Sequence, residues 1–184
     1  IGQVNGLTVR SQGDHSFGGP SRVTARAYIG RRGVLNIERD VAMGGPIQQK
    51  AAMILQGYFA GQFARRIPPS FTASMTFEQN YGGVEGDSAT LAEAAAIISD
   101  LTQLPARQDI AITGSMNQLG VAQSVGGVHH KVEGFFRSCV EAGGLTGTQG
   151  CIVPASNADS LVLDEEVTSA IAAGTFSIWT AETL

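Results

Sequence analysis

The segment YGGVEGDSATLAEAAAIISD, residues 81–100, places a glycine-rich, acidic turn directly before an alanine-rich stretch of helical character. Ser88 lies at the junction. One interpretation is that Asp87 or Ser88 is simply the N-cap of the helix, because both side chains accept hydrogen bonds from the free amides of a first turn. One cap is enough, however, and here two capping residues stand side by side behind three glycines.

The alternative interpretation makes Ser88 a nucleophile. The preceding glycines let the backbone turn sharply and let a substrate approach closely. A helix N-terminus also presents unpaired N–H groups and a partial positive charge, which together stabilise an oxyanion. A hydroxyl group at this junction therefore has the surroundings that acyl-transfer chemistry needs.

A serine nucleophile needs a base, and two residue types could supply it. The histidine candidates are His15, His129 and His130. Lysine serves instead when burial lowers its pKa enough to leave some neutral amine. Only two of the 12 basic residues are lysines, Lys50 and Lys131, and the rest are arginines.

Lys131 belongs to the segment SVGGVHHKVEGFF, residues 124–136, where it adjoins an apolar helical face of valines and phenylalanines. The competing interpretation is a surface lysine whose stem covers that face while its amine stays in water. Lys50 lies beside two glutamines on a long amphipathic segment, where we expect a solvated side chain. Spacing alone leaves a Ser–Lys and a Ser–His arrangement open.

Size and composition restrict the class of protein. A chain of 184 residues with 43% hydrophobic and 15% charged residues can form one soluble domain with a hydrophobic core. The net charge of -4 argues against a general nucleic-acid surface, and no apolar run is long enough to span a membrane. Ile1 is not an initiator residue and no signal peptide follows it, so we expect a piece of a longer protein. Cys139 and Cys151 fit neither a zinc motif nor a disulfide framework, which favours free thiols and a cytoplasmic location.

The hydrophobic pattern predicts strands and helices in irregular order, which is typical of a single α+β (mixed α/β) domain over residues 1–184 with mixed sheets and about four helices. We expect Gly13, Gly18, Gly19 and Pro20 to break the chain between the first two strands. The expected strands are residues 3–9, 21–29, 34–38, 70–77, 109–113, 120–125, 151–153 and 176–179. The expected helices run from Pro46 to Pro68–Pro69, from Ser88 to about Leu104–Pro105, from Gly126–Gly127 to about Ala142, and over residues 164–173.

Two other kinds of site are not predicted. No G-x-x-x-x-G-K-[S/T] or G-x-G-x-x-G pattern occurs, so we expect no nucleotide site in these residues. His129 and His130 are neighbours that should point apart on a helix, and no carboxylate at i+4 spacing completes a metal site.

Four motifs taken together resemble the proteolytic domain of Lon proteases. They occur in the family order over nearly the whole chain: VNGLTV at residues 4–9, EGDSA at residues 85–89, ITGS at residues 112–115 and VGGVHHK at residues 125–131. The Glu-Gly-Asp-Ser sequence is similar to the LonB pattern rather than to the Pro-Lys-Asp-Gly-Pro-Ser of LonA. The likeness is greatest to bacterial LonB-like, Lon-related ATP-dependent proteases.

The resemblance implies a Ser–Lys dyad in which Ser88 is the nucleophile and Lys131 the general base. Thr113 matches the threonine that orients the lysine, and the amides around Asp87 and Ser88 match the oxyanion hole. His129 and His130 occupy variable family positions. The implied activity is ATP-dependent endopeptidase cleavage of unfolded or damaged proteins. The alternative is a non-catalytic binding or scaffold domain on the same fold.

The resemblance also implies partners. The family joins this domain to an AAA+ ATPase, which would hold ATP and Mg²⁺ outside these residues, and it assembles into six-membered rings. We expect protein or peptide substrates, no cofactor or metal within these residues, and no membrane or nucleic-acid partner. Relatives often carry Gly-x-Val-Leu-Pro where residues 120–124 read GVAQS, a segment that would shape the substrate channel. Asp87 would favour the charged form of a nearby lysine, so we expect it to pair with Lys131 and restrain the isolated domain.

Overall fold

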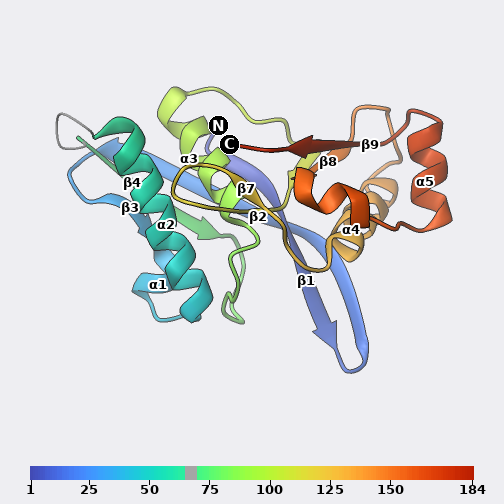
Figure 1. Cartoon of the computed structure of the whole chain (residues 1–184), viewed down its shortest axis with the longest axis horizontal. Helices are drawn as coiled ribbons and strands as arrows, with labels where there is room; N and C mark the ends of the chain where they lie inside the picture. The colour runs from blue at the N-terminus through green and yellow to red at the C-terminus, as the bar shows by residue number, and fades with distance from the viewer. Residues whose placement is uncertain (65–69) are drawn as a thin grey trace.

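A computed structural model describes residues 1–64 and 70–184, and Figure 1 shows their arrangement. A mixed seven-stranded sheet has the order β3-β4-β2-β1-β5-β8-β9. Two of its six neighbouring pairs, β1–β2 and β2–β4, are antiparallel, and the other four are parallel. Its strands are β1 (Gln3–Gln12), β2 (His15–Ile29), β3 (Gly33–Asn36), β4 (Phe71–Phe77), β5 (Ile110–Ile112), β8 (Gly150–Pro154) and β9 (Ser177–Ala181).

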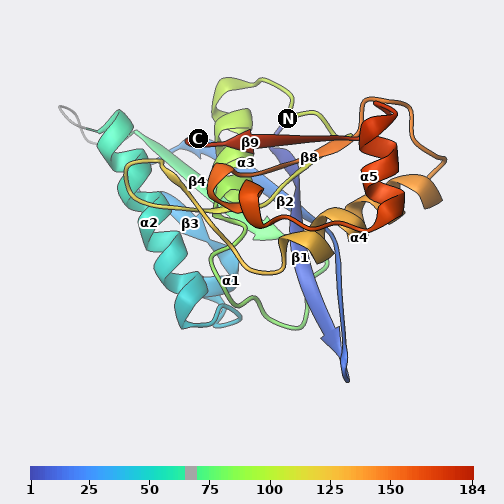
Figure 2. The ribbon, with the colours of Figure 1, turned by 45° about the vertical axis from the view of Figure 1, so that its right-hand side comes forward.

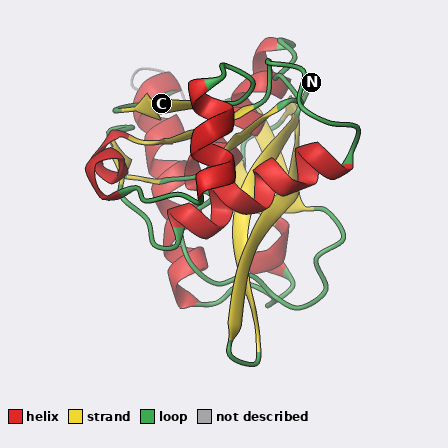
Figure 3. Cartoon of the chain, turned by 90° about the vertical axis from the view of Figure 1, so that its right-hand side faces the viewer, coloured by secondary structure: helices red, strands yellow, loops and turns green. Residues whose placement is uncertain are grey.

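The β1–β2 hairpin occupies the middle of the sheet, and its tip projects well beyond the other elements (Figure 3). A separate two-stranded ribbon, β6 (Ser115–Met116) and β7 (Ala122–Gln123), lies outside the main sheet. Mixed strand directions together with helices confirm the predicted α+β class. The helices are α1 (Ile37–Asp40), α2 (Pro46–Phe63), α3 (Thr90–Thr102), α4 (Val128–Glu141), the 3-10 helix η1 (Ala155–Ser160) and α5 (Glu165–Ala172).

The helices divide the hydrophobic interior into two clusters. One joins α2 and α3 to β4 and includes Leu55, Phe59 and Ile97. The other joins α4 and α5 to β5 and β8 and includes Phe136, Val153 and Phe176. Figure 2 shows α2 on one side of the hairpin and α4 with α5 on the other. Because α3 and α4 both contact β1 and β2, the hairpin fixes the two helices relative to each other.

Most expected elements are present, with four corrections. The strand expected over residues 34–38 is β3 and ends at Asn36, because Ile37 begins α1. Gly18, Gly19 and Pro20 do not break the chain, because β2 runs through them from His15. The helix expected from Ser88 begins at Thr90. The strand expected over residues 120–125 is only β7. Helix α2 begins at Pro46, as the N1 preference of proline predicts, whereas its expected stop at Pro68–Pro69 lies outside the described residues.

The glycines of β2 allow a close contact between a strand and a helix. A Cβ atom on Gly18 would lie 1.9 Å from the carbonyl oxygen of His130, and one on Gly134 would lie 2.0 Å from the carbonyl oxygen of Gly18. The backbones of β2 and α4 therefore meet with no side chain between them. Glycine inside a strand often marks such an approach, and this explains why Gly18 does not end the strand.

No helix in the described part of the chain is both long enough and apolar enough to cross a membrane.

Candidate active site

Ser88 lies in the turn that leads into α3. The first helical residue is Thr90, its N-cap is Ala89, and no side chain caps the helix. The interpretation of Asp87 or Ser88 as a capping residue is therefore wrong. Ser88 is half-buried, and among residues 1–64 and 70–184 its hydroxyl group has no hydrogen-bond partner.

Lys131 lies in the first turn of α4 and is buried, with 2% of its surface exposed. The surface-lysine interpretation is therefore wrong, whereas Lys50 is exposed on α2 as expected. The Lys131 ammonium nitrogen donates a hydrogen bond to the Thr113 hydroxyl across 3.1 Å. Burial lowers the pKa of Lys131 to about 8, and the negative charge of Asp87 opposes this change.

Thr113 connects the lysine to the serine turn. It follows β5, is fully buried, and donates its hydroxyl hydrogen to the Ser88 carbonyl oxygen at 3.1 Å. The same carbonyl oxygen accepts a bond of 2.8 Å from the Gly114 amide. The Thr113 amide in turn donates to the Ile152 carbonyl oxygen of β8 at 3.0 Å. The end of β5 thus holds the Ser88 backbone and the Lys131 amine together.

Asp87 has a different partner from the one expected. Its carboxylate accepts a hydrogen bond of 2.7 Å from the Ser115 hydroxyl. In the described residues Asp87 forms no ion pair with Lys131, so the expected direct pairing is wrong, although Asp87 is near enough to raise the lysine pKa. Sequence reasoning gave Ser115 no role; its place two residues after Thr113 in the ITGS motif was the available signal.

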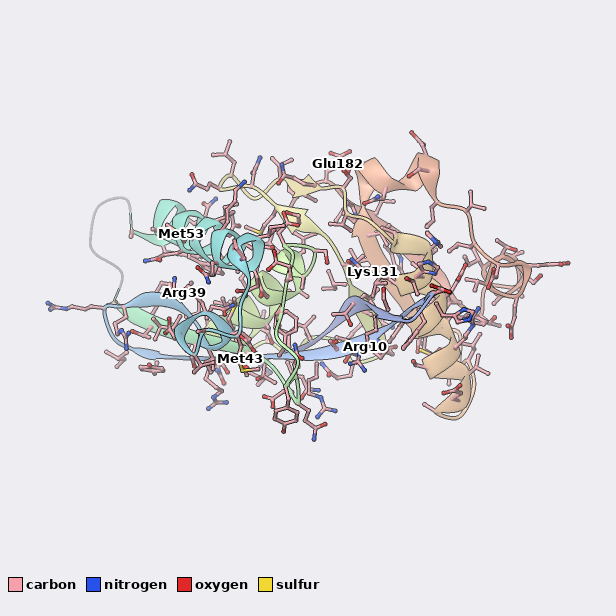
Figure 4. The ribbon with its side chains drawn as sticks, turned by 90° about the horizontal axis from the view of Figure 1, so that it is seen from below. Arg10, Arg39, Met43, Met53, Lys131 and Glu182 are labelled. Atoms are coloured by element: carbon pink, nitrogen blue, oxygen red, sulfur yellow. The ribbon has the colours of Figure 1, made fainter. Side chains whose placement is uncertain are left out.

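Ser88 and Lys131 line the same cleft, which has a volume of about 800 Å³. One wall comes from the β1–β2 hairpin at residues 8–10 and 20–22, and another comes from residues 77–80 and 83–85. Gly126, which precedes α4, also lines the cleft. Figure 4 labels Lys131 on α4 and Arg10 on β1, which belong to two of the elements around it.

The turn before α3 also offers free backbone donors. No group in the described residues accepts a hydrogen bond from the amide of Asp87 or of Ser88. Unpaired amides at the edge of a cleft can bind negative charge on an oxygen atom.

The histidines lie away from the cleft. The rings of His129 and His130 were expected to point apart, but they lie side by side, with 4.0 Å between their centroids. Neither they nor His15 lines the cleft. Within the part of the chain that the structure describes, no group of three or more His, Cys, Asp or Glu residues could hold a metal ion.

Comparison with known proteins identifies the family. Residues 82–175, slightly more than half of the chain, match the model of the Lon protease (S16) C-terminal proteolytic domain. The chain belongs to the Lon protease family. The matched residues include Ser88, Thr113 and Lys131, which the fold brings to one place.

Individual Lon relatives extend the match to both ends of the chain. A Lon protease homolog of Escherichia coli is 45% identical over 99% of this chain and 31% of the relative. A homolog of Haemophilus influenzae is 41% identical over 99% of this chain and 30% of the relative. An archaeal Lon protease of Pyrococcus abyssi is 31% identical over 90% of this chain and 15% of the relative. The chain thus spans about a third or less of the length of these relatives.

The Lon family match begins at residue 82, after the hairpin that forms one wall of the cleft. The similarity to the two bacterial relatives nevertheless includes the residues of that wall, because it covers nearly the whole chain. Membership of the Lon family places the chain among proteolytic domains. The cleft that contains Ser88 and the buried Lys131 is the candidate active site.

Proposed function

We propose that this chain is the proteolytic part of a serine endopeptidase in which Ser88 is the nucleophile and Lys131 the general base. The observation that carries the proposal is a buried lysine with a pKa lowered to about 8 in the same cleft as a half-buried serine. A lysine in water is almost fully charged at neutral pH and cannot accept a proton. Near a pKa of 8, about a tenth of the amine is neutral at a pH of about 7.

In this mechanism the neutral Lys131 amine takes the proton from the Ser88 hydroxyl as its oxygen attacks the substrate carbonyl carbon. Because Ser88 and Lys131 share no hydrogen bond in the described structure, the serine side chain rotates towards the amine when substrate binds. The amides of Asp87 and Ser88 receive the developing oxyanion. Lys131 then gives its proton to the leaving amine nitrogen, which breaks the peptide bond and leaves an acyl-enzyme.

Water hydrolyses the acyl-enzyme in the second half of the reaction. Lys131, neutral again, takes a proton from the water as its oxygen attacks the ester carbonyl, and then returns the proton to the Ser88 oxygen as the ester bond breaks. Thr113 keeps the amine at one place throughout, because its hydroxyl both accepts from Lys131 and donates to the Ser88 backbone. The supporting role of Asp87 is electrostatic, through its charge near Lys131.

The remaining features of the proposal concern the whole protein. Relatives about three times as long support a further module in the same protein. We assign the binding of ATP and Mg²⁺ to an AAA+ module outside these residues, which delivers unfolded or damaged proteins to the cleft. We further propose that the whole protein assembles as a ring of six copies and works in the cytoplasm.

Labelling tests the nucleophile most directly. The full-length protein is treated with a fluorophosphonate, which modifies activated serines, and peptide mass spectrometry locates the adduct. In the wild type, the expected site of the adduct is Ser88, and peptide cleavage should fall in proportion to labelling. The Ser88→Ala variant should form no adduct. A fully folded protein that neither reacts at Ser88 nor cleaves peptides in the presence of ATP would instead be a binding or scaffold domain.

A further inference from the structure

Asn157 holds the chain segment in front of the base-bearing helix. Its side-chain oxygen accepts a hydrogen bond of 3.0 Å from the Val125 amide, and its side-chain nitrogen donates one of 3.0 Å to the Val125 carbonyl oxygen. Both backbone groups of Val125 are thus paired with a single carboxamide, much as a neighbouring strand would pair them. Asn157 itself is buried, with 9% of its surface exposed.

Besides these two bonds, the side chain of Val125 packs against the hydrophobic cluster around α4, and the two residues that follow it are glycines. Val125 is followed by Gly126 and Gly127, and glycine leaves a chain with more conformational freedom than any other residue. Gly127 adopts φ 64° as the N-cap of α4, and no side chain caps that helix. Lys131 begins its own helical hydrogen bonding at this point, because its amide donates to the Gly127 carbonyl oxygen at 3.1 Å.

The other end of the contact is anchored to the strand that positions Thr113. Asn157 lies in η1, which follows β8 directly. In β8, the Ile152 carbonyl oxygen accepts from the Thr113 amide at 3.0 Å, and Thr113 is the residue that receives the Lys131 hydrogen bond. Strand β8 therefore holds Thr113, the hydrogen-bond partner of Lys131, and leads directly into η1, whose Asn157 holds the segment before α4.

We propose that Asn157 is a positioning residue for the peptidase reaction, which acts through Val125 to hold the segment 124–127, whose Gly126 forms part of the wall of the cleft beside Lys131. This inference rests on the proposed function. Gly126 in that wall lines the same cleft as Ser88 and Lys131. Asn157 does not touch the reacting atoms, because neither it nor Val125 lines the cleft.

The wall matters because Lys131 depends on exclusion of water. Burial is the main cause of its lowered pKa, so a segment that moves away and admits water would return the pKa towards the ordinary lysine value. At any pH below that pKa the neutral fraction of the amine would then fall. A purely structural loss would lower the amount of folded enzyme, or the rate at every pH, without moving the pH dependence.

The test is the pH dependence of kcat/KM for cleavage of a quenched fluorescent peptide by the full-length protein. For the wild type we expect kcat/KM to rise with pH, and the midpoint of this rising limb to lie near a pH of about 8. For Asn157→Ala we expect the limb to move up by about one pH unit, which lowers kcat/KM about tenfold at a pH of about 7, with the deficit shrinking above a pH of about 9.

The matched control is Gln149→Ala. Gln149 also bonds two backbone groups through its carboxamide, but in the loop that follows the other end of α4. Its side-chain oxygen accepts from the Thr146 amide at 2.9 Å, and its side-chain nitrogen donates to the Gly144 carbonyl oxygen at 3.5 Å. It should leave the limb in place. If Asn157→Ala does not fold, Asn157→Ser, with a neutral side chain too short to bond both groups of Val125, is measured in its place and should show the same shift.

An unchanged limb in an active, folded Asn157 variant overturns this inference and leaves the proposed function intact. A loss of rate that is equal at every pH also overturns it, because that result assigns Asn157 a structural role only. A wild-type protein without peptidase activity overturns the proposed function itself, and this inference with it.

Discussion

The Lys131 amine and the Thr113 hydroxyl lie 3.1 Å apart in a buried position, and within the described residues this is the only hydrogen bond that the amine makes. A charged ammonium group normally requires several polar partners when it leaves water. With one neutral partner the charged form is poorly stabilised, which agrees with the lowered pKa of Lys131.

The first prediction concerns Lys131→Arg. A guanidinium group keeps the positive charge but does not lose its proton below a pH of about 12, so it cannot act as the base. We expect peptide cleavage by the full-length protein to fall at least a hundredfold, as in Ser88→Ala. The control is Lys50→Arg, which changes an exposed lysine on α2 and should match the wild type in both rate and thermal stability.

The histidine alternative gives the opposite pattern in the same assay. If a histidine were the base, His129→Gln or His130→Gln would be inactive and Lys131→Arg would be tolerated. The structure disfavours this outcome, because none of the three histidines lines the cleft that contains Ser88. Substantial turnover by Lys131→Arg would contradict the dyad.

The second prediction concerns the hydroxyl of Thr113. Thr113→Val keeps the shape of the side chain but removes the acceptor for Lys131 and the donor to the Ser88 carbonyl oxygen. We expect a loss of about 1–2 kcal/mol in the free energy of unfolding. The acceptor favours the charged amine, so its removal should move the rising limb of kcat/KM to lower pH while kcat falls because the amine is no longer oriented.

Thr113→Ser provides the comparison, since it restores the hydroxyl without the methyl group. Its pH limb should return to the wild-type position. A Thr113→Val enzyme with a wild-type kcat would show that this hydroxyl does not orient the lysine.

The third prediction concerns the charge of Asp87. Asp87→Asn keeps an oxygen that can accept the Ser115 hydrogen bond but removes the negative charge that raises the pKa of Lys131. The rising limb should therefore move to lower pH, and activity near a pH of about 7 should be above that of the wild type. This result would also support a restraining role for Asp87, exerted through space rather than through an ion pair. A limb that moves to higher pH would contradict the electrostatic role.

The fourth prediction concerns a buried acid on the serine-bearing side of the fold. Glu93, in the first turn of α3, is buried, and its pKa is raised to about 8 by burial and by the charge of Glu38, against a smaller lowering effect of Gln48. The neighbouring Glu38 uses one carboxylate oxygen to accept bonds of 2.7 Å from the Thr76 hydroxyl and the Phe77 amide. Its second oxygen is buried, and in the described residues it has no hydrogen-bond partner.

Because the folded state binds the Glu93 proton more tightly than the unfolded state, the stability that this group contributes is full below a pH of about 4.5 and is lost as the pH rises through about 8. Glu93→Gln is neutral at every pH. Its free energy of unfolding relative to wild type should therefore improve between a pH of about 5 and about 8.5, by on the order of 1 kcal/mol or more.

Denaturant unfolding at the two pH values measures this difference. The control, Glu166→Gln, removes an exposed carboxylate on α5 and should show no change between them. A Glu93→Gln variant with the same relative stability at both values would mean that Glu93 is already ionised in the folded protein.

The sequence was sufficient for the parts of the fold and site that depend on local patterns. Pro46 marked the start of α2, and alternation predicted β4 to within one residue and the start of β1, which continues three residues beyond its expected end. The motifs around Ser88, Thr113 and Lys131 selected three residues that the structure brings together, although their catalytic roles remain proposals.

The features that sequence reasoning missed depend on tertiary contacts. Gly18 reads as a chain breaker because nothing in a single sequence shows that a helix backbone will press against it. Asp87 seemed free to pair with Lys131 because the competing Ser115 hydroxyl is 28 positions away. Asn157 is an ordinary polar residue in the sequence, and only the fold brings it to Val125, 32 positions earlier.

The direct backbone contact between Gly18 and Gly134 also bears on when the site comes into existence. Their separation of 116 positions makes it a non-local contact, and such contacts close late because the intervening chain must first be ordered. A chain emerging during synthesis carries Ser88 long before residue 134 is available to dock α4. Until α4 docks, the buried position of Lys131 does not exist, so under the proposed function a growing chain has no working peptidase site.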